Sequence, residues 1–538
     1  MTNGRTFGTS AALWCGSAAI AMLTGLATAQ ADELQLNQQA LDARIDQLAA
    51  VGLQPGAGAV FSVDQNKAAG SPTLAGSFPR SILIPGTDTS IKIYGQITEI
   101  LDYWMSGGGV AANTSPSNTT VDDNGFGQNT PLHNSIAAAR GGGVFQQSPR
   151  ESKIGFETRT PTPFGEARTV LEWDWTEAGS FVPGGSDPVS VSDNLAPRLR
   201  YAYATLGGLL AGQATSNFSD PDANGETLDF GGNFGEPGHV RVPQVRWTMP
   251  AWWGTSFSVS AEQPETVIAT ANGLEANDAG VIPTLTTSCS TGAPASASTP
   301  ANSTCTTSLL TSGVTPLNIA KSTAPDFTAA WYIPQPWGHL DFSGVLRPAV
   351  HVADGKYFSK TFIGYGGHIG MSFRPGWMGW AKDTLSAHFT IGDTIGPFLN
   401  ASTNFDLATN YGAPSTATSA GTYGGFNGPT SAASAAAILF KPTQEMGAEL
   451  GYQHWWLDNL RSNISGGFNA HYGIPIKLVG AAQAGSINKE LISAHANVIW
   501  NPVSFVDIAL EYTWSQRTVL NNQTGTQNVL ISKLAFRF

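Results

Sequence analysis

Apolar and polar positions alternate along many short segments between residue 89 and the C-terminus. In residues 169–175, for example, Leu171 and Trp173 share one parity, whereas Glu172 and Asp174 share the other. A period of two residues is that of a β-strand, and segments of about ten residues with one apolar and one polar face are typical of a transmembrane β-barrel. A soluble β-sandwich also alternates, but it rarely places Trp and Tyr at its strand ends. The pattern therefore favours a barrel.

Reading back from the C-terminus, we predict about sixteen such strands. They lie at residues 89–104, 152–160, 167–176, 197–206, 208–216, 241–249, 255–263, 325–333, 338–351, 361–374, 382–395, 444–456, 460–472, 487–500, 503–517 and 528–538. The predicted fold is thus all-β, a closed antiparallel transmembrane barrel. An even number of strands brings both ends of the barrel to the same side of the membrane.

The predicted connections alternate between short and long. Short turns include residues 160–166, 250–254, 334–338 and 457–459, whereas long loops span residues 106–151, 264–324 and 396–442. Short periplasmic turns and long outer loops are the expected asymmetry of a bacterial outer-membrane barrel. Seven tryptophans fall at or beside the short turns and predict an aromatic girdle there: Trp252, Trp253, Trp337, Trp377, Trp380, Trp456 and Trp500.

The residues before the barrel divide into three segments. Residues 1–31 are predicted to be a cleaved signal peptide, because a mildly apolar run ends in the small-x-small site Ala29-Gln30-Ala31. An uncleaved membrane anchor is the alternative. Residues 32–50 are predicted to be a short heptad helix, residues 51–86 a linker rich in Gly, Ala, Pro and Ser, and residues 87–538 the barrel domain.

The heptad helix is a candidate assembly element. Leu34, Leu41 and Leu48 repeat every seven residues, and Gln38 and Ile45 occupy the other core position of the same heptads. Fewer than three heptads predict a coiled coil only weakly, and a lone surface helix is the alternative. A solitary helix of this length is marginal in water, which favours assembly into a coil.

Composition and cysteine usage narrow the function classes. The 538 residues include 12% charged residues and carry a net charge of −12, which argues against nucleic acid as a partner because a phosphate-binding surface is basic. Besides Cys15 in the predicted signal peptide, the chain contains Cys289 and Cys305. In an exported protein these two cysteines predict one disulfide. A zinc site would need further ligands, and no His, Asp or Glu lies between them; no metal or cofactor is expected.

The last strand carries the most specific pattern. Leu530, Leu534, Phe536 and Phe538 share one parity, and the chain ends on an aromatic residue. This arrangement resembles the C-terminal insertion signal that the barrel-assembly machinery of Gram-negative bacteria reads. It predicts insertion into outer-membrane lipid.

Several segments together resemble the DcaP-like outer-membrane porins. The similarity is carried by FPRS at 78–81, IPGTDTSIK at 84–92, LRYAYATLGGLLAGQ at 199–213 and HANVIWNP at 495–502. It covers the mature chain, with the long loops matching least. The resemblance implies a homotrimer of sixteen-stranded barrels, each with its own pore, that takes up small organic acids and related anionic solutes.

A candidate constriction follows from the order of the loops. The third outer loop, residues 217–240, carries acidic candidates, and the nearby strands carry basic candidates at lumen parity. The acidic residues are Asp220, Asp222, Glu226, Asp229 and Glu236, and the basic residues are Lys153, Arg159, Arg168, Arg198, Arg200 and Arg246. A transverse field between acidic loop and basic wall would orient dipolar or anionic solutes. Alternatively, the charges pair with one another or with Glu157, Glu172 and Asp174 and hold the loop in place.

No catalytic motif is present, so we expect a passive porin for small polar solutes that favours carboxylates, and no enzymatic activity. Six histidines, His339, His351, His368, His388, His471 and His495, mostly take lumen parity and are predicted to be solvated residues of the pore wall. Two alternatives stay open. One is a barrel hydrolase with a site assembled across strands at the rim, and the other is an adhesin or structural barrel with a plugged lumen.

Overall fold

The computed structural model describes most of the predicted barrel domain. The described residues are 75–107, 132–133, 142–178, 195–235, 240–270, 273–276, 285–290, 304–309, 320–353, 356–399, 405–410, 436–476, 478–479, 484–485 and 487–538. The predicted signal peptide and heptad helix, and most of the linker, lie outside them. Within the described residues, no helix is long and apolar enough to cross a membrane.

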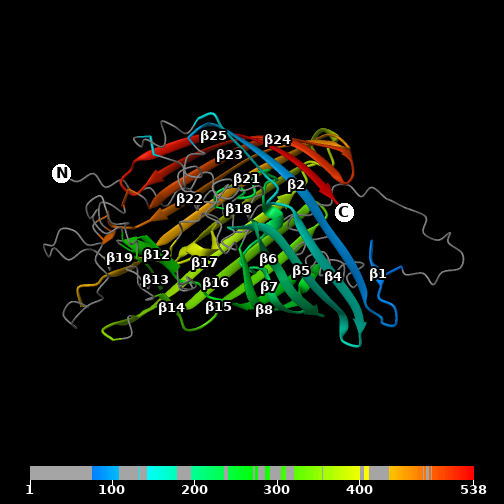
Figure 1. Cartoon of the computed structure of the whole chain (residues 1–538). Helices are drawn as coiled ribbons and strands as arrows, with labels where there is room; N and C mark the ends of the chain where they lie inside the picture. Colours follow the sequence, from blue (N-terminus) through cyan, green and yellow to red (C-terminus); the bar gives the residue numbers. More distant parts are fainter. Residues whose placement is uncertain are drawn as a thin grey trace, which may run out of the picture.

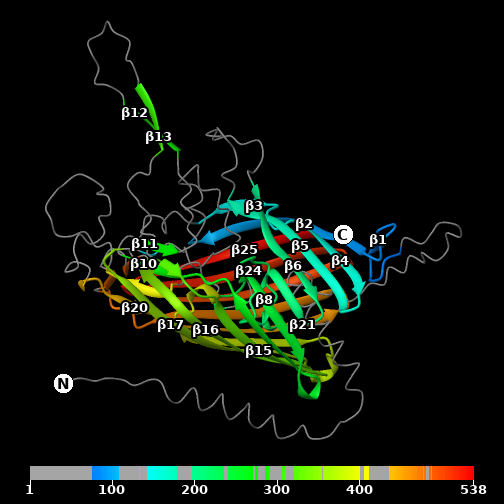
Figure 2. The ribbon, with the colours of Figure 1, turned by 90° about the horizontal axis from the view of Figure 1, so that it is seen from below.

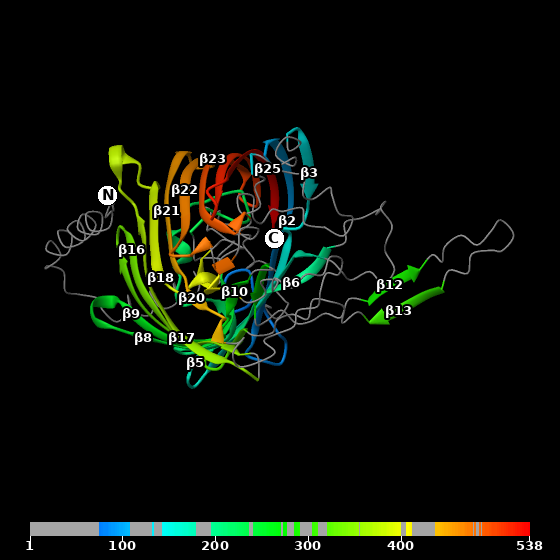
Figure 3. The same ribbon diagram turned by 90° about the vertical axis from the view of Figure 1, so that its left-hand side faces the viewer.

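Sixteen antiparallel strands of the described chain form a closed barrel, as the alternation predicts (Figures 1 and 3). The first of them, β2 (Ser90–Ser106), pairs with the last, β25 (Thr524–Arg537), so that no edge is left open. Between them, in order around the wall, lie β4 (Lys153–Thr162), β5 (Gly165–Ala178), β6 (Leu195–Leu206), β7 (Leu209–Thr215), β8 (Arg241–Pro250), β9 (Ser256–Glu262), β15 (Asp326–Gln335), β16 (Gly338–Ala353), β17 (Ser359–Phe373), β18 (Thr384–Asp393), β21 (Gln444–Leu457), β22 (Leu460–Tyr472), β23 (Asn488–Val503) and β24 (Val506–Val519).

Shorter strands lie within segments that the alternation assigned to the linker or to loops. β1 (Ile82–Leu83) and β3 (Val144–Ser148) pair with β2, and β14 (Ala320–Ser322) pairs with β16. A separate sheet consists of β10 (Val267–Thr270), β11 (Gly273–Ala276), β19 (Leu407–Thr409) and β20 (Phe440–Pro442), and β12 (Leu285–Ser290) pairs with β13 (Thr304–Leu309), clear of the barrel wall in Figures 2 and 3. Four 3-10 turns, η2 (Pro221–Ala223), η3 (Trp252–Gly254), η4 (Trp377–Gly379) and η5 (Gly396–Phe398), complete the described elements.

The two faces of the wall have the polarity of a membrane barrel. On β21, Leu450 is 58% exposed, whereas its neighbour Glu449 is 4% exposed. Ile93, Ile363 and Ile464 repeat the exposed apolar pattern on other strands, and buried polar residues alternate with them. The outward face is therefore apolar and suits lipid, and the inward face is polar.

The short turns carry exposed aromatic side chains. Trp252 and Trp253 in η3, Trp377 in η4 and Trp456 at the end of β21 are all more than half exposed. Trp380 and Trp500 add less exposed rings at the same end. This placement gives the short-turn end the aromatic belt of a membrane interface.

The long-loop end is held by a buried arginine. Arg347 of β16 is fully buried and donates hydrogen bonds to Asp326 at 3.0 Å, to Asp406, and to the carbonyls of Thr394 and Glu265. Because Asp406 and Glu265 belong to segments outside the wall, one guanidinium ties two long loops to the barrel. Apolar residues of β10 and β19 pack beside it against the outer end of β16.

Candidate functional site

The loop between β7 and β8, residues 216–240, folds against the inward face of the barrel. We call it the constriction loop. Asp220 Oδ2 lies 2.7 Å from His339 Nε2 on β16. The backbone N–H of Gly225 donates to Glu449 on β21 at 2.6 Å, and that of Leu228 donates to Glu511 on β24 at 2.7 Å. Contacts with strands this far apart around the wall show that the loop crosses the interior.

Glycines on the inward face allow the loop to approach the wall backbone. A Cβ atom at Gly467 of β22 would lie 2.3 Å from the carbonyl oxygen of Phe234, and one at Gly451 of β21 would lie 2.9 Å from the Cα atom of Gly225. Neither contact is possible for a larger residue without moving backbone. These positions therefore shape the seat of the loop.

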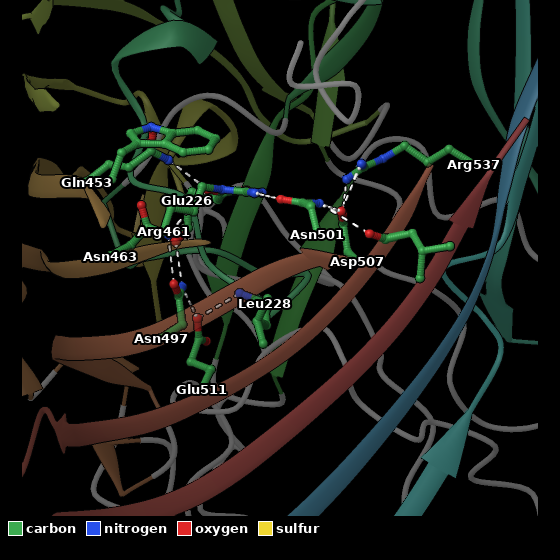
Figure 4. A network of polar contacts seen from close by, with 12 residues as sticks. Glu226, Leu228, Gln453, Arg461, Asn463, Asn497, Asn501, Asp507, Glu511 and Arg537 are labelled. Carbon is green, nitrogen blue, oxygen red and sulfur yellow. Dashed lines mark hydrogen bonds and ion pairs between the residues drawn. The ribbon is translucent and has the colours of Figure 1, made fainter. Parts of the chain in front are cut away.

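Glu226 of the constriction loop is held by several side chains of the wall (Figure 4). Arg461 of β22 donates to both of its oxygens, at 2.6 and 2.7 Å, in the bidentate geometry that guanidinium favours. Gln453 adds a hydrogen bond of 2.7 Å from β21. Arg461 also donates to Asn501, which continues the network toward Asp507 and Arg537 at the last strand. The network joins the loop to the seam of the barrel.

Wall histidines support the carboxylates that receive the loop. His388 Nε2 lies 2.9 Å from Glu449, and His495 Nδ1 lies 3.0 Å from Glu511. The predicted lumen parity of these histidines agrees with the structure, but His388 and His495 are 4% and 3% exposed rather than solvated. The constriction loop covers them, and alternation along one strand contains no information about a loop that crosses the barrel.

The basic candidates lie on β4, β5, β6 and β8, with wall carboxylates as neighbours. Arg200 donates to Glu172 at 2.7 Å and to Asp174 at 2.6 Å, and Arg198 donates to Asp174 at 2.6 Å. Both Arg159 and Arg168 donate to Glu157, at 2.7 and 2.9 Å. Lys153 and Arg246 are 4% and 2% exposed.

These partners are the wall carboxylates that the sequence offered as the alternative to a field between loop and wall: Glu157, Glu172 and Asp174. The cause is register: Asp174 lies directly opposite Arg198 in the β5–β6 ladder, so the two side chains meet without any loop. The loop instead reaches both arginines through Phe230, whose ring centre lies 5.3 Å from the guanidinium of Arg198 and 5.4 Å from that of Arg200. Such contacts are cation–π interactions.

The other candidates are placed as follows. Asp222 lies in η2, and Asp229 Oδ1 accepts a hydrogen bond from the N–H of Gly231 at 2.8 Å, whereas Glu236 lies outside the described residues. Phe536 and Phe538 are about half exposed at the seam, where Phe538 exchanges backbone hydrogen bonds with Gly95. No cluster of metal-ligating side chains is found among the described residues.

A comparison with protein families agrees with this architecture. The family model of the porin subfamily matches residues 82–530, well over half of the chain. The chain belongs to the porin subfamily. The family and the closed barrel fit the outer membrane of a bacterium, and this porin is accordingly an outer-membrane channel protein. No curated protein sequence matches it.

Solved structures support the fold of this porin. The outer membrane channel DcaP of Acinetobacter baumannii is 18% identical, with a TM-score of 0.56 over 84% of this chain and 97% of that chain. The predicted resemblance to DcaP-like porins is confirmed. Two other structures are more distant, and we draw no argument from them. OmpF of Salmonella typhi in complex with daunomycin is 9% identical, with a TM-score of 0.42 over 84% of this chain and 98% of that chain. An anion-selective porin from Comamonas acidovorans is 8% identical, with a TM-score of 0.41 over 84% of this chain and 100% of that chain.

Proposed function

We propose that this porin is a passive diffusion channel for small polar solutes, that it favours small organic anions such as carboxylates, and that it works as a homotrimer. Two carboxylates of the constriction loop are engaged on the far wall, Asp220 with β16 and Glu226 with β21 and β22, and the basic candidates lie on β4 to β8. A solute that passes between the constriction loop and the wall formed by β4 to β8 therefore meets mainly basic side chains.

The observation that carries the anion preference is the relative exposure of the paired charges. The side chain of Arg198 is 27% exposed above Asp174, which is 1% exposed, and Arg159 is 21% exposed above Glu157 at 8%. In both pairs the guanidinium faces the water and the carboxylate lies beneath it. Asp174 accepts from Nε and Nη2 of Arg198 and so fixes the guanidinium, and a permeating carboxylate can accept from its outward edge. Arg159 also lies 3.5 Å from Glu166, whose side chain is 46% exposed, so we expect the smaller effect from Arg159.

Reversal potentials in a salt gradient test this proposal. A unit charge about 7 Å from an ion in water changes its energy by about 0.6 kcal/mol, with opposite sign for anions and cations. Arg198→Gln or Arg159→Gln should therefore lower the anion-to-cation permeability ratio by roughly three- to sevenfold at low salt, and less as salt screens the charge. Lys489→Gln, which removes an exposed charge that contacts Asn522 in the turn between β24 and β25, is the control and should have little effect.

Two results would contradict the proposal. A wild-type channel that prefers cations at low salt would exclude the assignment of the basic wall as the selective surface. Absence of any conductance in planar bilayers, from protein that is folded on unheated gels, would favour the plugged barrel instead.

A further inference from the structure

A histidine and an aspartate form a pair on the outer surface of the barrel, at the short-turn end. His454 of β21 shares its parity with Leu450 and Trp456, which are 58% and 60% exposed. The opposite parity belongs to Gln453 and Glu449, which bind the constriction loop inside. His454 therefore faces outward, toward the lipid, and takes no part in the pore.

Asp383, just before β18, fixes the orientation of the imidazole. Its carboxylate accepts hydrogen bonds from His454 Nδ1 at 2.8 Å, from the Tyr452 hydroxyl at 2.5 Å and from the Trp455 N–H at 3.1 Å. Burial raises the pKa of Asp383, but these three donors outweigh burial and hold it below its usual range. An ionised carboxylate accepts the Nδ1–H of His454 and directs Nε2 away from it, so a second proton, on Nε2, is the one that an anion can bind.

The remaining nitrogen of His454 lies in an aromatic setting. Trp380 and Trp456 contact the imidazole edge-on, with ring centres 4.5 and 4.3 Å away. Among the described residues, no group forms a hydrogen bond with Nε2, and the side chain keeps 11% exposure. Lys382, next to Asp383, belongs to the other side of the strand. Its Nζ pairs with Asp458 at 2.6 Å and lies 5.3 Å from the ring centre of Trp455, which has the inward parity of Gln453.

The surface above this pair is apolar. Leu450 on β21 and Ile464 on β22 are 58% and 68% exposed and lie farther from the short turns than His454. The arrangement from rim to mid-wall is thus an imidazole nitrogen, indole rings and then aliphatic side chains, which is the polarity of a phospholipid. We infer that His454 Nε2–H binds the phosphate of a phospholipid of the periplasmic leaflet, whose acyl chains lie along Leu450 and Ile464.

A hydrolytic site at the rim is the competing interpretation, because Ser462 lies opposite His454 in the β21–β22 ladder. Ester hydrolysis by such a set requires a hydrogen bond from serine to histidine. In this structure Ser462 Oγ instead accepts a hydrogen bond from Trp456 Nε1 at 2.9 Å, and none joins Ser462 to His454. The geometry points to binding of a headgroup rather than to its cleavage.

Native mass spectrometry of the full-length porin in detergent tests the inference. Wild-type protein is titrated with phosphatidylglycerol, with diacylglycerol of the same chains, which lacks the phosphate, and with phosphatidylglycerol in the presence of excess inorganic phosphate. We expect retention of phosphatidylglycerol, weaker retention of diacylglycerol and little competition by inorganic phosphate. His454→Phe should weaken phosphatidylglycerol binding by about tenfold, since a charge-assisted hydrogen bond contributes roughly 1.5 kcal/mol or more.

Two further variants and one control make the result decisive. Asp383→Asn should weaken binding through the misplaced imidazole, and His454→Gln, which keeps a donor, should restore part of it. The control is His351→Phe, which removes an exposed histidine bonded to Thr361 near the other end of β16. Unchanged channel conductance shows that each variant is folded.

Three outcomes would overturn the inference. They are equal affinity for diacylglycerol and phosphatidylglycerol, equal affinity of wild-type protein and His454→Phe for phosphatidylglycerol, and release of lysolipid and fatty acid during the incubation. The last would identify Asp383, His454 and Ser462 as a hydrolytic set.

Discussion

Individual ion pairs of this porin differ in how their partners come together. Asp174 and Arg198 are neighbours on adjacent strands, so strand alternation and register are sufficient to bring them together. Asp220 and His339 are separated by 119 residues, and their contact depends on the path of the constriction loop through the barrel. Contacts of the first kind can be derived from a sequence, whereas contacts of the second kind need the path of a loop with no periodic pattern.

The two cysteines that follow the predicted signal peptide give a prediction at this scale. Cys289 and Cys305 are direct partners in the β12–β13 ladder, and directly opposed residues have Cα atoms about 4.5 to 5.5 Å apart, within the range of a disulfide. We expect a disulfide that closes a loop of about seventeen residues. By restricting the unfolded chain, it should stabilise the local structure by roughly 3 kcal/mol. Mass spectrometry of protein from intact cells, with and without reduction, measures it.

The effect should be local, because this hairpin forms a sheet of its own, separate from the wall. Cys289→Ser should leave the heat stability of the barrel on unheated gels unchanged. Two free thiols in the native protein would contradict the disulfide, and a failure of Cys289→Ser to fold would contradict its local character.

At the scale of elements, the wall follows from alternation and the outer loops do not. The strand predicted at residues 460–472 coincides with β22, because a short turn marks its start and a period of two marks its length. The sheet of β10, β11, β19 and β20 has no such pattern. Its strands have three or four residues each, and the parallel pairing of Ile268 with Leu407 joins two loops that are distant in sequence. Nothing local in either loop predicts that contact.

The constriction loop gives a second prediction. Arg461 is 3% exposed at its side chain, and Glu226 is 15% exposed, so Arg461→Ala removes the counter-charge of a largely buried carboxylate. Loss of one partner of a buried pair costs about 3 to 5 kcal/mol. The loop should detach locally near Glu226, and single-channel recordings should show higher conductance with more open-channel noise.

Matched variants separate the loss of this anchor from general destabilisation. Arg461→Lys keeps the charge without the bidentate fork and should have an intermediate effect. Arg517→Ala removes an arginine that donates to Asn488 across two wall strands and should leave the noise unchanged. Quiet channels of wild-type conductance in Arg461→Ala would show that the remaining contacts, such as those of Gly225 and Leu228, are sufficient to hold the loop.

At the scale of the whole molecule, the described chain begins at the short-turn end of the barrel. β1 pairs with the start of β2, where Leu83 lies opposite Ser90, and Phe538 lies opposite Gly95 at the same end. The preceding residues 51–74 can span at most about 80 Å when extended. A helix at residues 32–50 would therefore lie on the periplasmic side, within reach of two neighbouring barrels.

If three such helices form a coil, it should hold three barrels together. Leu41→Asp combined with Ile45→Asp would bury unpaired charge along the seam of the coil, so trimers in detergent should dissociate at a lower temperature than wild-type trimers on unheated gels. Ala43→Asp combined with Gln47→Asp adds the same charge to the outward face of the predicted helix and is the matched control. Because a closed barrel has no strand edge to lose, the monomers released by the seam variant should stay folded and keep their conductance. An unchanged dissociation temperature would show that contacts between the barrel walls alone hold the assembly.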